Sequence, residues 1–501
     1  MTAELSHAPA VQARPVSGAW GWRRRGAGRA AHVDPGTLYQ ATTVQLCGLY
    51  PFAQGSGAKT FGVPMGRHLH TAEPVGVDPG EWLRSGLVTN TGLWVQAQPG
   101  VGKSTFAKRL GAGLVAFGTR LLSPGDTKGE YSALVRALDG QVVTIGRGLD
   151  RINPLDSGPI GQLLRARGDQ LGRRTRDELA DQVRARRLIM LEALCAIVRH
   201  RELREDERVL LGVALDRYTQ ATPHGEPTVG EIHRILTPTD PDPILIAAAH
   251  AADAREYRSL ARPLLHTMEL LLHGSIKGLF DGPSTISVRM DVPAVSLDIS
   301  HLDDQDDDAV AAAMLCSWAW GSSMVDAARA AGEHTTFYMI LDEMWRALRA
   351  APGLVERSDR LTRLNRQRGV ISAMITHSLD DLEALPTEQD RAKARGLIDR
   401  CGIVVLGGLP PKELDRLTRI TPLTSGEAGL VTSWAAPPTW VPGVAHPGRG
   451  RYLIKSGERI GIPLRLDLVG VERDLYDTDR AWHERPALAA GHLQDAPGGD
   501  R

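Results

Sequence analysis

The chain has 501 residues, a length that suggests roughly two to four domains, or one large domain that carries an insertion. Hydrophobic residues make up 42% of it, which is enough to build a sizeable core. Lys plus Arg and Asp plus Glu both number 59, and the resulting formal charge of zero excludes a protein that coats polyanions over its whole surface, while a local basic face stays compatible with it.

The cysteines and the apolar runs indicate the environment of the chain. The cysteines lie far apart in the sequence and form no C-x-x-C pair; they are Cys47, Cys195, Cys316 and Cys401. This spacing excludes a zinc knuckle and a disulfide-stapled scaffold, and it suits a reducing compartment. The longest apolar run, Ala309–Trp320, is too short to span a bilayer, and Arg23–Arg25 precede no apolar segment of a signal peptide. We therefore expect a soluble, cytoplasmic protein.

The amino-terminal part is expected to be irregular at first and then β-rich. Residues 1–35 are polar, basic and rich in Pro and Gly, which is typical of a disordered basic arm, with contact to a membrane or a partner as the alternative. Residues 36–90 hold short segments punctuated by glycine, and we expect strands near Phe61–Gly66 and Val75–Gly80. A small β-rich amino-terminal segment is the prediction for this region.

From Leu93 onward strands and helices alternate. Residues 93–97 (LWVQA) predict a strand, a glycine turn follows, and Ser104–Phe117 is predicted as a helix. Arg120–Leu122 and Gln141–Ile145 indicate further strands. This order is typical of an α/β fold with a parallel sheet, of which residues 91–156 are the first part.

Residues 157–275 change to the periodicity of helices. Thr175 with Glu178, and Thr228 with Glu231, have the spacing of capping boxes, and apolar residues follow each pair at helical intervals. We expect an all-helical subdomain inserted into the sheet.

Residues 276–484 are predicted to complete the α/β core. Strands are expected at Ile286–Met290, Ala294–Ile299, Thr335–Leu341, Val370–Ile375 and Ile403–Leu406. Ala309–Ala331 predicts a buried helix, and Tyr452–Ile454 with Ile462–Leu466 predicts a hairpin. Residues 485–501 have the composition of a disordered tail.

The strongest chemical signal is a phosphate-binding loop between a strand and a helix. The loop follows the pattern A-x-x-x-x-G-K-S-T and consists of Ala97, Gln98, Pro99, Gly100, Val101, Gly102, Lys103, Ser104 and Thr105. The glycines let backbone N–H groups turn toward phosphate oxygens, Lys103 supplies a charge for the β and γ phosphates, and the Ser104 hydroxyl can ligate Mg²⁺. A chance glycine turn is the alternative, but the apolar strand before the loop and the helix after it favour nucleotide binding.

Two adjacent carboxylates, Asp342 and Glu343, follow the apolar strand Thr335–Leu341. In nucleoside triphosphatases, an Asp at this place typically holds the water shell of Mg²⁺. The neighbouring Glu can polarise the attacking water. The alternative is an ordinary acidic pair that ends a strand. With the loop at Lys103 in the same chain, we favour the metal and catalytic roles.

A series of further motifs brings a family into view. In chain order, and including the loop, they are Gly62–Gly66, Ala97–Thr105, Asp126–Tyr131 (D-x-x-G-E-Y), Ile152–Asp156, Phe280–Pro283, Asp342–Trp345 and Thr376–His377. Taken alone, the motifs at Asp126 and Ile152 indicate only turns, because their residue types are common in turns. In this order they resemble the conjugation and type IV secretion ATPases of the TraC type (the VirB-four class), within the FtsK–HerA group of P-loop motors. The resemblance spans roughly residues 60–470.

The resemblance implies a RecA-like P-loop domain that binds ATP and Mg²⁺ and works as a homo-hexamer on the cytoplasmic face of a secretion channel. Asp126 is placed with the nucleotide-binding residues on the same ground. Channel proteins are then the implied partners, with peripheral attachment to the inner face of the cell membrane through them, and DNA is a further candidate.

Two departures from the family pattern stand out. Members usually carry a long amino-terminal domain that docks on the channel, whereas about 90 residues precede the loop here, so docking is expected to be reduced or delegated to another chain. The sensor position after the fourth strand is usually Gln, and here it is His377. Imidazole can still donate to a γ-phosphate or a water, and its protonation would make the site pH-sensitive. A purely structural histidine is the alternative.

Arginines recur every three residues before the strand Val370–Ile375, at Arg357, Arg360, Arg363 and Arg366, with Arg368 just beyond. We expect Arg366 to act as a catalytic residue on the nucleotide of a neighbouring subunit, because the strand that follows it delivers Thr376 and His377 to the site. A solvated helix face and a basic rim that faces DNA are the alternatives.

The leading hypothesis is a Mg²⁺-dependent ATPase that energises a conjugative or type IV secretion apparatus. A HerA- or FtsK-like DNA translocase is the first alternative. A nucleotide-binding switch or scaffold that does not hydrolyse ATP is the second, and Glu343 argues against it, because a degenerate site would be expected to lose the water-polarising carboxylate first.

Overall fold

The structure is a computed structural model, and it describes residues 61–285, 288–356, 367–436 and 446–476. The chain divides into two compact units, Met1–Ser56 and Gly57–Arg501, and every described residue belongs to the second. Outside the described residues lie the predicted arm at 1–35, residues 36–60 of the predicted β-rich segment, the tail at 485–501, Cys47, and the arginines from Arg357 to Arg366.

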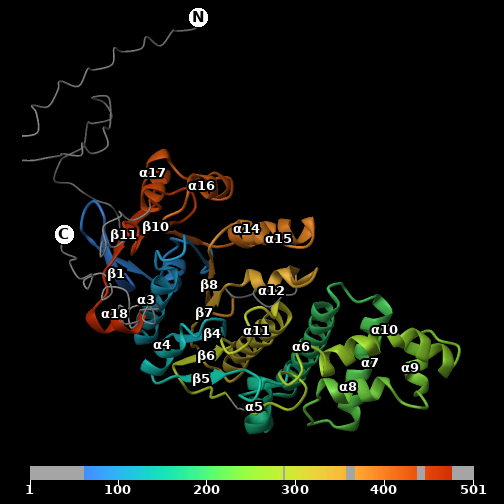
Figure 1. Cartoon of the computed structure of the whole chain (residues 1–501). Coiled ribbons are helices and arrows are strands. Elements are labelled where there is room, and N and C mark those ends of the chain that lie inside the picture. Colours follow the sequence, from blue (N-terminus) through green and yellow to red (C-terminus); the bar gives the residue numbers. More distant parts are fainter. Residues whose placement is uncertain (1–60, 286–287, 357–366, 437–445, 477–501) are drawn as a thin grey trace, which may run out of the picture. The chain divides into compact units, whose positions relative to one another are not determined.

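The strands of the described residues form one sheet of eleven, in the order β2-β1-β11-β10-β9-β3-β8-β7-β4-β6-β5 (Figure 1). Their bounds are β1 Val63–His68, β2 Pro74–Val77, β3 Leu93–Gln96, β4 Arg120–Asp126, β5 Gln141–Thr144, β6 Ala294–Asp298, β7 Phe337–Asp342, β8 Val370–Thr376, β9 Ile403–Leu406, β10 Arg451–Lys455 and β11 Ile462–Leu466. From β9 to β5 all neighbours are parallel, and from β9 to β2 all are antiparallel.

The parallel strands are apolar because helices cover both of their faces. Within the described residues, the helices outside the insertion are α2 Pro79–Arg84, α3 Lys103–Ala116, α4 Ser132–Ala137, α11 Asp307–Ala330, α12 Trp345–Arg349, α14 Asp380–Glu383, α15 Glu388–Asp399, α16 Pro411–Leu417, α17 Ser425–Trp434 and α18 Gly470–Tyr476. Successive residues of β3 point to opposite layers: Leu93 and Val95 join the core under α3 and α4, and Trp94 joins the core that contains α11. This alternation is the pattern expected of a central strand that is buried on both faces.

The antiparallel edge includes the strands predicted near the amino terminus. β1 pairs with β11 and with β2, so these strands extend the main sheet rather than form a sheet of their own. The predicted hairpin at Tyr452–Ile454 and Ile462–Leu466 is confirmed, since β10 and β11 pair antiparallel. The strand predicted at Ile286–Met290 is absent from the described residues 288–290, and the next strand begins at Ala294.

A run of helices interrupts the sheet between β5 and β6, as the periodicity predicts. They are α5 Gly158–Arg167, α6 Arg173–Arg199, α7 Glu205–Ala221, α8 Val229–Leu236, α9 Pro243–Ala248 and α10 Ala254–His273. The capping box of Thr228 and Glu231 is confirmed. The one predicted at Thr175 and Glu178 is wrong: α6 already begins at Arg173, and Glu178 accepts a hydrogen bond from Arg174 at 2.8 Å within the helix. Thr175 and Glu178 therefore both lie inside the first turns of the helix instead of at its cap.

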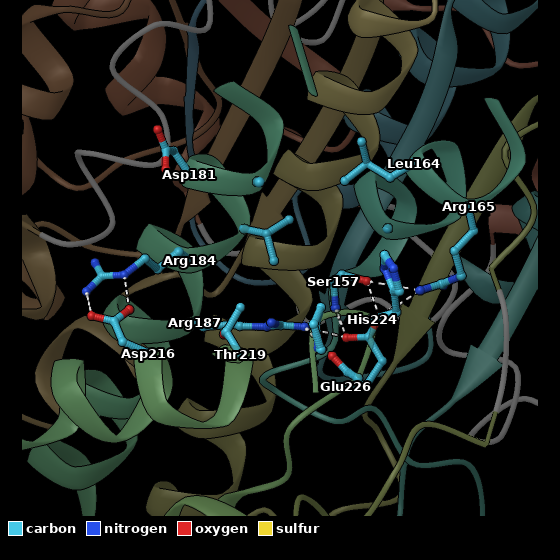
Figure 2. Close-up of a pocket in the computed structure, with 15 residues that line it drawn as sticks. Ser157, Leu164, Arg165, Asp181, Arg184, Arg187, Asp216, Thr219, His224 and Glu226 are labelled. Carbon is cyan, nitrogen blue, oxygen red and sulfur yellow. Dashed lines mark hydrogen bonds and ion pairs between the residues drawn. The ribbon is translucent and has the colours of Figure 1, made fainter. Parts of the chain in front are cut away.

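Glu226 ties the start of the insertion together. Its carboxylate accepts hydrogen bonds from the backbone N–H of Ser157 at 2.7 Å, from Arg165 at 2.8 Å and from Arg187 at 2.6 Å. Figure 2 shows these side chains converging beside a small cavity of about 270 Å³, with the ion pair of Arg184 and Asp216 at a separate point of its wall. Because the cations of this cavity are paired with carboxylates of the same wall, the cluster acts as a structural tie.

Within the described residues, no helix has both the length and the apolar character that a bilayer crossing requires.

Candidate nucleotide-binding site

The candidate site lies at the carboxyl edge of the parallel strands. β3, β8, β7 and β4 are consecutive neighbours, and each is followed at this edge by residues that the sequence singled out. The phosphate-binding loop follows β3, His377 follows β8, Asp342 ends β7 with Glu343 next to it, and Asp126 ends β4. Ligand sites of open α/β sheets form at this edge.

The loop from Ala97 to Gly102 needs its glycines. Gly100 and Gly102 have φ angles of 78° and 106°, in the left-handed region that favours glycine. A Cβ on Gly102 would lie 2.8 Å from the hydroxyl oxygen of Tyr452, and that hydroxyl donates a hydrogen bond of 2.6 Å to the Gly102 carbonyl. A side chain at Gly102 would therefore disturb both the backbone and its contact with β10.

Neighbouring strands hold the rest of the loop. The Gln98 N–H donates to the carbonyl of Gly408 at 3.0 Å, and the Val101 carbonyl accepts from the N–H of Gly450 at 3.1 Å. Ala97 is buried against Gly407, where a Cβ would lie 2.5 Å from the Ala97 methyl group. Pro99 and Gly100 are exposed at the tip of the loop. The loop is thus fixed at its base and open at its tip, which is what a phosphate cradle requires.

Lys103 is the first residue of α3, and Ser104 and Thr105 follow in its first turn. The Lys103 ammonium donates to the Gln98 carbonyl at 3.4 Å and lies 2.7 Å from Nδ1 of His377. Burial lowers the pKa of Lys103 to about 8, against the opposing effect of the nearby carboxylates Asp342 and Glu343. The helix directs the positive end of its dipole at the same point.

Asp342 has a donor on each of its carboxylate oxygens. The Tyr131 hydroxyl donates to Oδ2 at 2.7 Å, and the Glu343 N–H donates to Oδ1 at 3.0 Å. Burial raises the pKa of Asp342 to about 6, and the adjacent charge of Glu343 adds to this effect. A nearby divalent cation would favour the ionised carboxylate, which is the form that holds a metal.

Glu343 is held by side chains from three segments. Oε1 accepts from Nε2 of His377 and from Nζ of Lys128, both at 2.7 Å, and Oε2 accepts from the indole N–H of Trp345 at 2.7 Å. Burial opposes ionisation of Glu343, but the hydrogen bonds from His377 and Lys128 outweigh it and hold the pKa of Glu343 well below its usual range.

His377 bridges the two predicted catalytic groups. Its Nδ1 faces the Lys103 ammonium, which has no lone pair, so Nδ1 is the acceptor and Nε2–H donates to Glu343. The structure therefore places His377 between the loop lysine and the acidic residue, at the place predicted for a sensor.

Asp126 faces its own turn. Its carboxylate accepts from the backbone N–H groups of Lys128, Glu130 and Tyr131 at 3.3, 3.1 and 2.8 Å. Burial raises the pKa of Asp126 to about 7, although the bond from Tyr131 opposes the shift and the charge of Asp298 reinforces it. In this geometry the carboxylate holds the turn, and its predicted contact with nucleotide stays a prediction.

The structure thus brings Lys103, Asp342, Glu343 and His377 together. It does not place Arg366, which lies outside the described residues. The start of β8 and His377 lie at opposite edges of the sheet, because β8 runs for seven residues, about 20 Å, between them. The predicted role of Arg366 on the nucleotide of a neighbouring subunit stays a prediction.

Sequence reasoning missed three residues that hold the acidic pair, Lys128, Tyr131 and Trp345. Each belongs to a motif that carries the family resemblance, two of them to D-x-x-G-E-Y and one to D-E-x-W. Tyr131 and Trp345 stand at defined positions of these motifs, which were the available signal, whereas Lys128 occupies an undefined position and left none.

Two cavities lie near the candidate site, one beside the loop and one beside Glu343. One of about 680 Å³ is lined by Val101, Gly102 and Thr105, and opposite them by Arg449, Tyr452 and Asp474. The other, of about 500 Å³, lies on the side of the acidic pair and is lined by Lys128, Glu343, Trp345 and His377. The first cavity thus opens beside the loop, and the second contains two of the predicted catalytic groups, Glu343 and His377.

Neither a protein-family model nor a curated protein matches this sequence. Among solved structures, VirB4 of Thermoanaerobacter pseudethanolicus is 21% identical, with a TM-score of 0.60 over 82% of this chain and 98% of that chain. The plasmid coupling protein TrwB in complex with ADP and Mg²⁺ is 12% identical, with a TM-score of 0.48 over 82% of this chain and 91% of that chain. The cytoplasmic domain of the type VII secretion ATPase EccC of Thermomonospora curvata is 14% identical, with a TM-score of 0.32 over 81% of this chain and 28% of that chain.

The likeness to VirB4 extends over most of both chains and concerns the fold. With the strand order and the loop geometry, it confirms the predicted α/β class, a RecA-like P-loop fold with a mostly parallel sheet.

Proposed function

We propose that this chain is a Mg²⁺-dependent ATPase that energises a conjugative or type IV secretion apparatus. The observation that carries the proposal is the convergence of Lys103, Asp342, Glu343 and His377 at one edge of a sheet with the fold of VirB4.

The residues present fit a nucleoside triphosphate with its metal. The glycine-lined loop and the amino terminus of α3 offer N–H groups to phosphate oxygens, and Lys103 adds a mobile cation. Ser104 and Asp342 would hold Mg²⁺, which when bound neutralises charge on the β and γ phosphates.

Glu343 and His377 are the residues proposed to act on the attacking water. Glu343 would orient the attacking water and take its proton, since its carboxylate is the predicted base and lines the adjacent cavity. Once Lys103 has moved to the phosphates, protonation of Nδ1 would let His377 donate from that nitrogen to the phosphate or to the water, while Nε2–H stays on Glu343. The protein therefore contributes positioning and charge, which are the main terms in phosphoryl transfer.

The cavity beside the loop suits the nucleoside. Its volume of about 680 Å³ exceeds that of one nucleoside, and Thr105 and Gly102 connect it directly to the phosphate loop. With the γ-phosphate directed at Glu343, the base and ribose would lie toward Arg449 and Asp474.

The further parts of the proposal follow the family resemblance. We propose a homo-hexamer with channel proteins as partners, located in the cytoplasm and attached at the inner face of the membrane through those partners. Within this assembly Arg366 would act on the nucleotide of a neighbouring subunit.

The test is a phosphate-release assay with purified protein, ATP and Mg²⁺, alone and with single- or double-stranded DNA. We expect Mg²⁺-dependent turnover that DNA changes little. Strong stimulation by DNA would favour a translocase of the HerA or FtsK type, and nucleotide binding without turnover would favour a switch or scaffold.

A further inference from the structure

Hydrogen bonds and close packing fix the backbone of the turn from Asp126 to Tyr131. The buried Asp126 carboxylate accepts three backbone N–H groups of the turn, and Gly129 has a φ of 66°. A Cβ on Gly129 would lie 3.0 Å from the Ser300 hydroxyl, so the turn also packs closely against the segment after β6. Such a turn presents its side chains in fixed directions.

The first of these side chains is Tyr131, which reaches Asp342. Its ring is buried, and its hydroxyl donates at 2.7 Å to Oδ2 of Asp342. With the Glu343 N–H on Oδ1, this bond fixes the plane of the carboxylate. A tyrosine that orients a metal-side carboxylate acts through that carboxylate and need not touch the metal.

The second is Lys128, which reaches Glu343. Its ammonium lies 2.7 Å from Oε1, while Trp345 holds Oε2. The Lys128 side chain is 51% exposed, so the lysine does not need this partner to satisfy a buried charge. The contact therefore serves the buried carboxylate rather than the lysine.

We propose that the turn Asp126–Tyr131 positions both acidic residues of the site, with Tyr131 orienting Asp342 toward Mg²⁺ and Lys128 orienting Glu343 toward the attacking water. The inference rests on the proposed function, and it assigns to the D-x-x-G-E-Y motif the role of positioning the two carboxylates. Tyr131 and Lys128 are both positioning residues. Loss of Tyr131 should therefore change Mg²⁺ binding, and loss of Lys128 should change the rate of hydrolysis.

The test of Tyr131 is the Mg²⁺ dependence of Tyr131→Phe, which removes one hydroxyl and keeps the ring. Binding of a fluorescent ATP analogue is measured during a Mg²⁺ titration, together with turnover. We expect the Mg²⁺ concentration at half-saturation to rise about tenfold, the lower end for losing a partner of a metal ligand, with binding in the absence of Mg²⁺ unchanged.

The matched control is Tyr257→Phe. The Tyr257 hydroxyl also makes a buried hydrogen bond, of 2.9 Å to the carbonyl of Leu236, but it lies in the helical insertion. We expect wild-type Mg²⁺ dependence from it. Wild-type Mg²⁺ dependence of Tyr131→Phe, or an equal shift in both variants, would overturn the role of Tyr131.

The test of Lys128 is the split between kcat and KM. We expect Lys128→Met to lower kcat by about tenfold or more at nearly unchanged KM, because a small misplacement of a reacting group is costly in rate. Lys128→Arg should restore most of the loss. Lys393→Met is the control, since Lys393 makes a similar contact of 2.6 Å with Glu356 elsewhere in the chain.

The outcomes separate the two levels of the proposal. A raised KM at normal kcat in Lys128→Met would make Lys128 a substrate contact and overturn its positioning role, as would normal values of both. A wild-type protein without Mg²⁺-dependent ATP binding or turnover would overturn the proposed function, and the inference with it.

Discussion

At the scale of single residues, the backbone of Glu343 carries strain at the point where the chemistry is proposed. Its φ of 50° lies in the left-handed region, which costs a residue with a side chain roughly 1–2 kcal/mol. The hydrogen bonds that His377, Lys128 and Trp345 donate to its carboxylate can offset this cost. The conformation turns the carboxylate away from the strand and toward the cavity that it lines.

The two carboxylates should fail in different ways when changed. Glu343→Gln keeps the shape of the side chain but loses the basic oxygen, so we expect normal ATP binding with turnover reduced about 10²- to 10⁴-fold. Asp342→Ala should instead weaken Mg²⁺-dependent binding. Fluorescent-nucleotide binding and phosphate release distinguish the two, with Glu388→Gln, an exposed carboxylate paired with Arg391, as the control. If Glu343→Gln lost affinity and Asp342→Ala did not, the two roles would be reversed.

Sequence reasoning could find Lys103, Asp342 and Glu343 because each stands in a local pattern of strand, turn and residue type. It could not find the contacts of Tyr131 and Lys128, which join residues separated by 211 and 215 positions. Those contacts exist because β4 and β7 are neighbours in the sheet, although the insertion and β6 lie between them in the chain. Strand order is a property of the whole sheet, so the residues of a short segment do not predict which strands are neighbours.

At the scale of elements, long apolar strands and helices were predictable, and their ends were less so. β9 begins and ends where predicted, because an isolated apolar run has clear limits. α6 begins at Arg173, before the predicted capping box, and Arg174 pairs with Glu178 inside the helix. The loop after β3 was predictable in sequence, but its anchoring to Gly408, Gly450 and Tyr452 came only from the fold.

The loop allows a prediction at this scale. Gly102→Ala adds a methyl group that would lie 2.8 Å from the Tyr452 hydroxyl, at a φ of 106°. We expect nucleotide binding to fall below detection while the far-ultraviolet circular dichroism stays normal. Gly118→Ala is the matched control: its φ of 88° is also left-handed, but the added methyl would meet nothing within 4 Å. Equal binding losses in both variants would mean that a general loss of stability, and not the change in the loop, lowers nucleotide binding.

At the scale of the whole molecule, the proposed homo-hexamer predicts that a residue of one subunit acts on the nucleotide of the next. Arg368, the one arginine of its series within the described residues, pairs with Asp326 of α11 at 3.5 Å and so has a structural partner. The start of β8 lies at the edge of the sheet away from His377, at a distance of about 20 Å. The role predicted for Arg366 carries one requirement, that the arginine acts on the nucleotide of a neighbouring subunit.

Mixed oligomers test this requirement. Lys103→Ala should abolish turnover, because the phosphates bound in the same subunit lose the lysine cation. Arg366→Ala should lower turnover at least about tenfold with little loss of ATP affinity, because a charge-stabilising group is missing from the neighbouring subunit's site. In an equimolar mixture, an Arg366→Ala subunit keeps an intact loop and can receive its arginine from a Lys103→Ala neighbour. If sites act independently, about a quarter of them are then complete, and we expect a corresponding share of wild-type turnover to return. An arginine that acted within its own subunit would leave every site of the mixture defective, so a mixture as inactive as its components would contradict the arrangement.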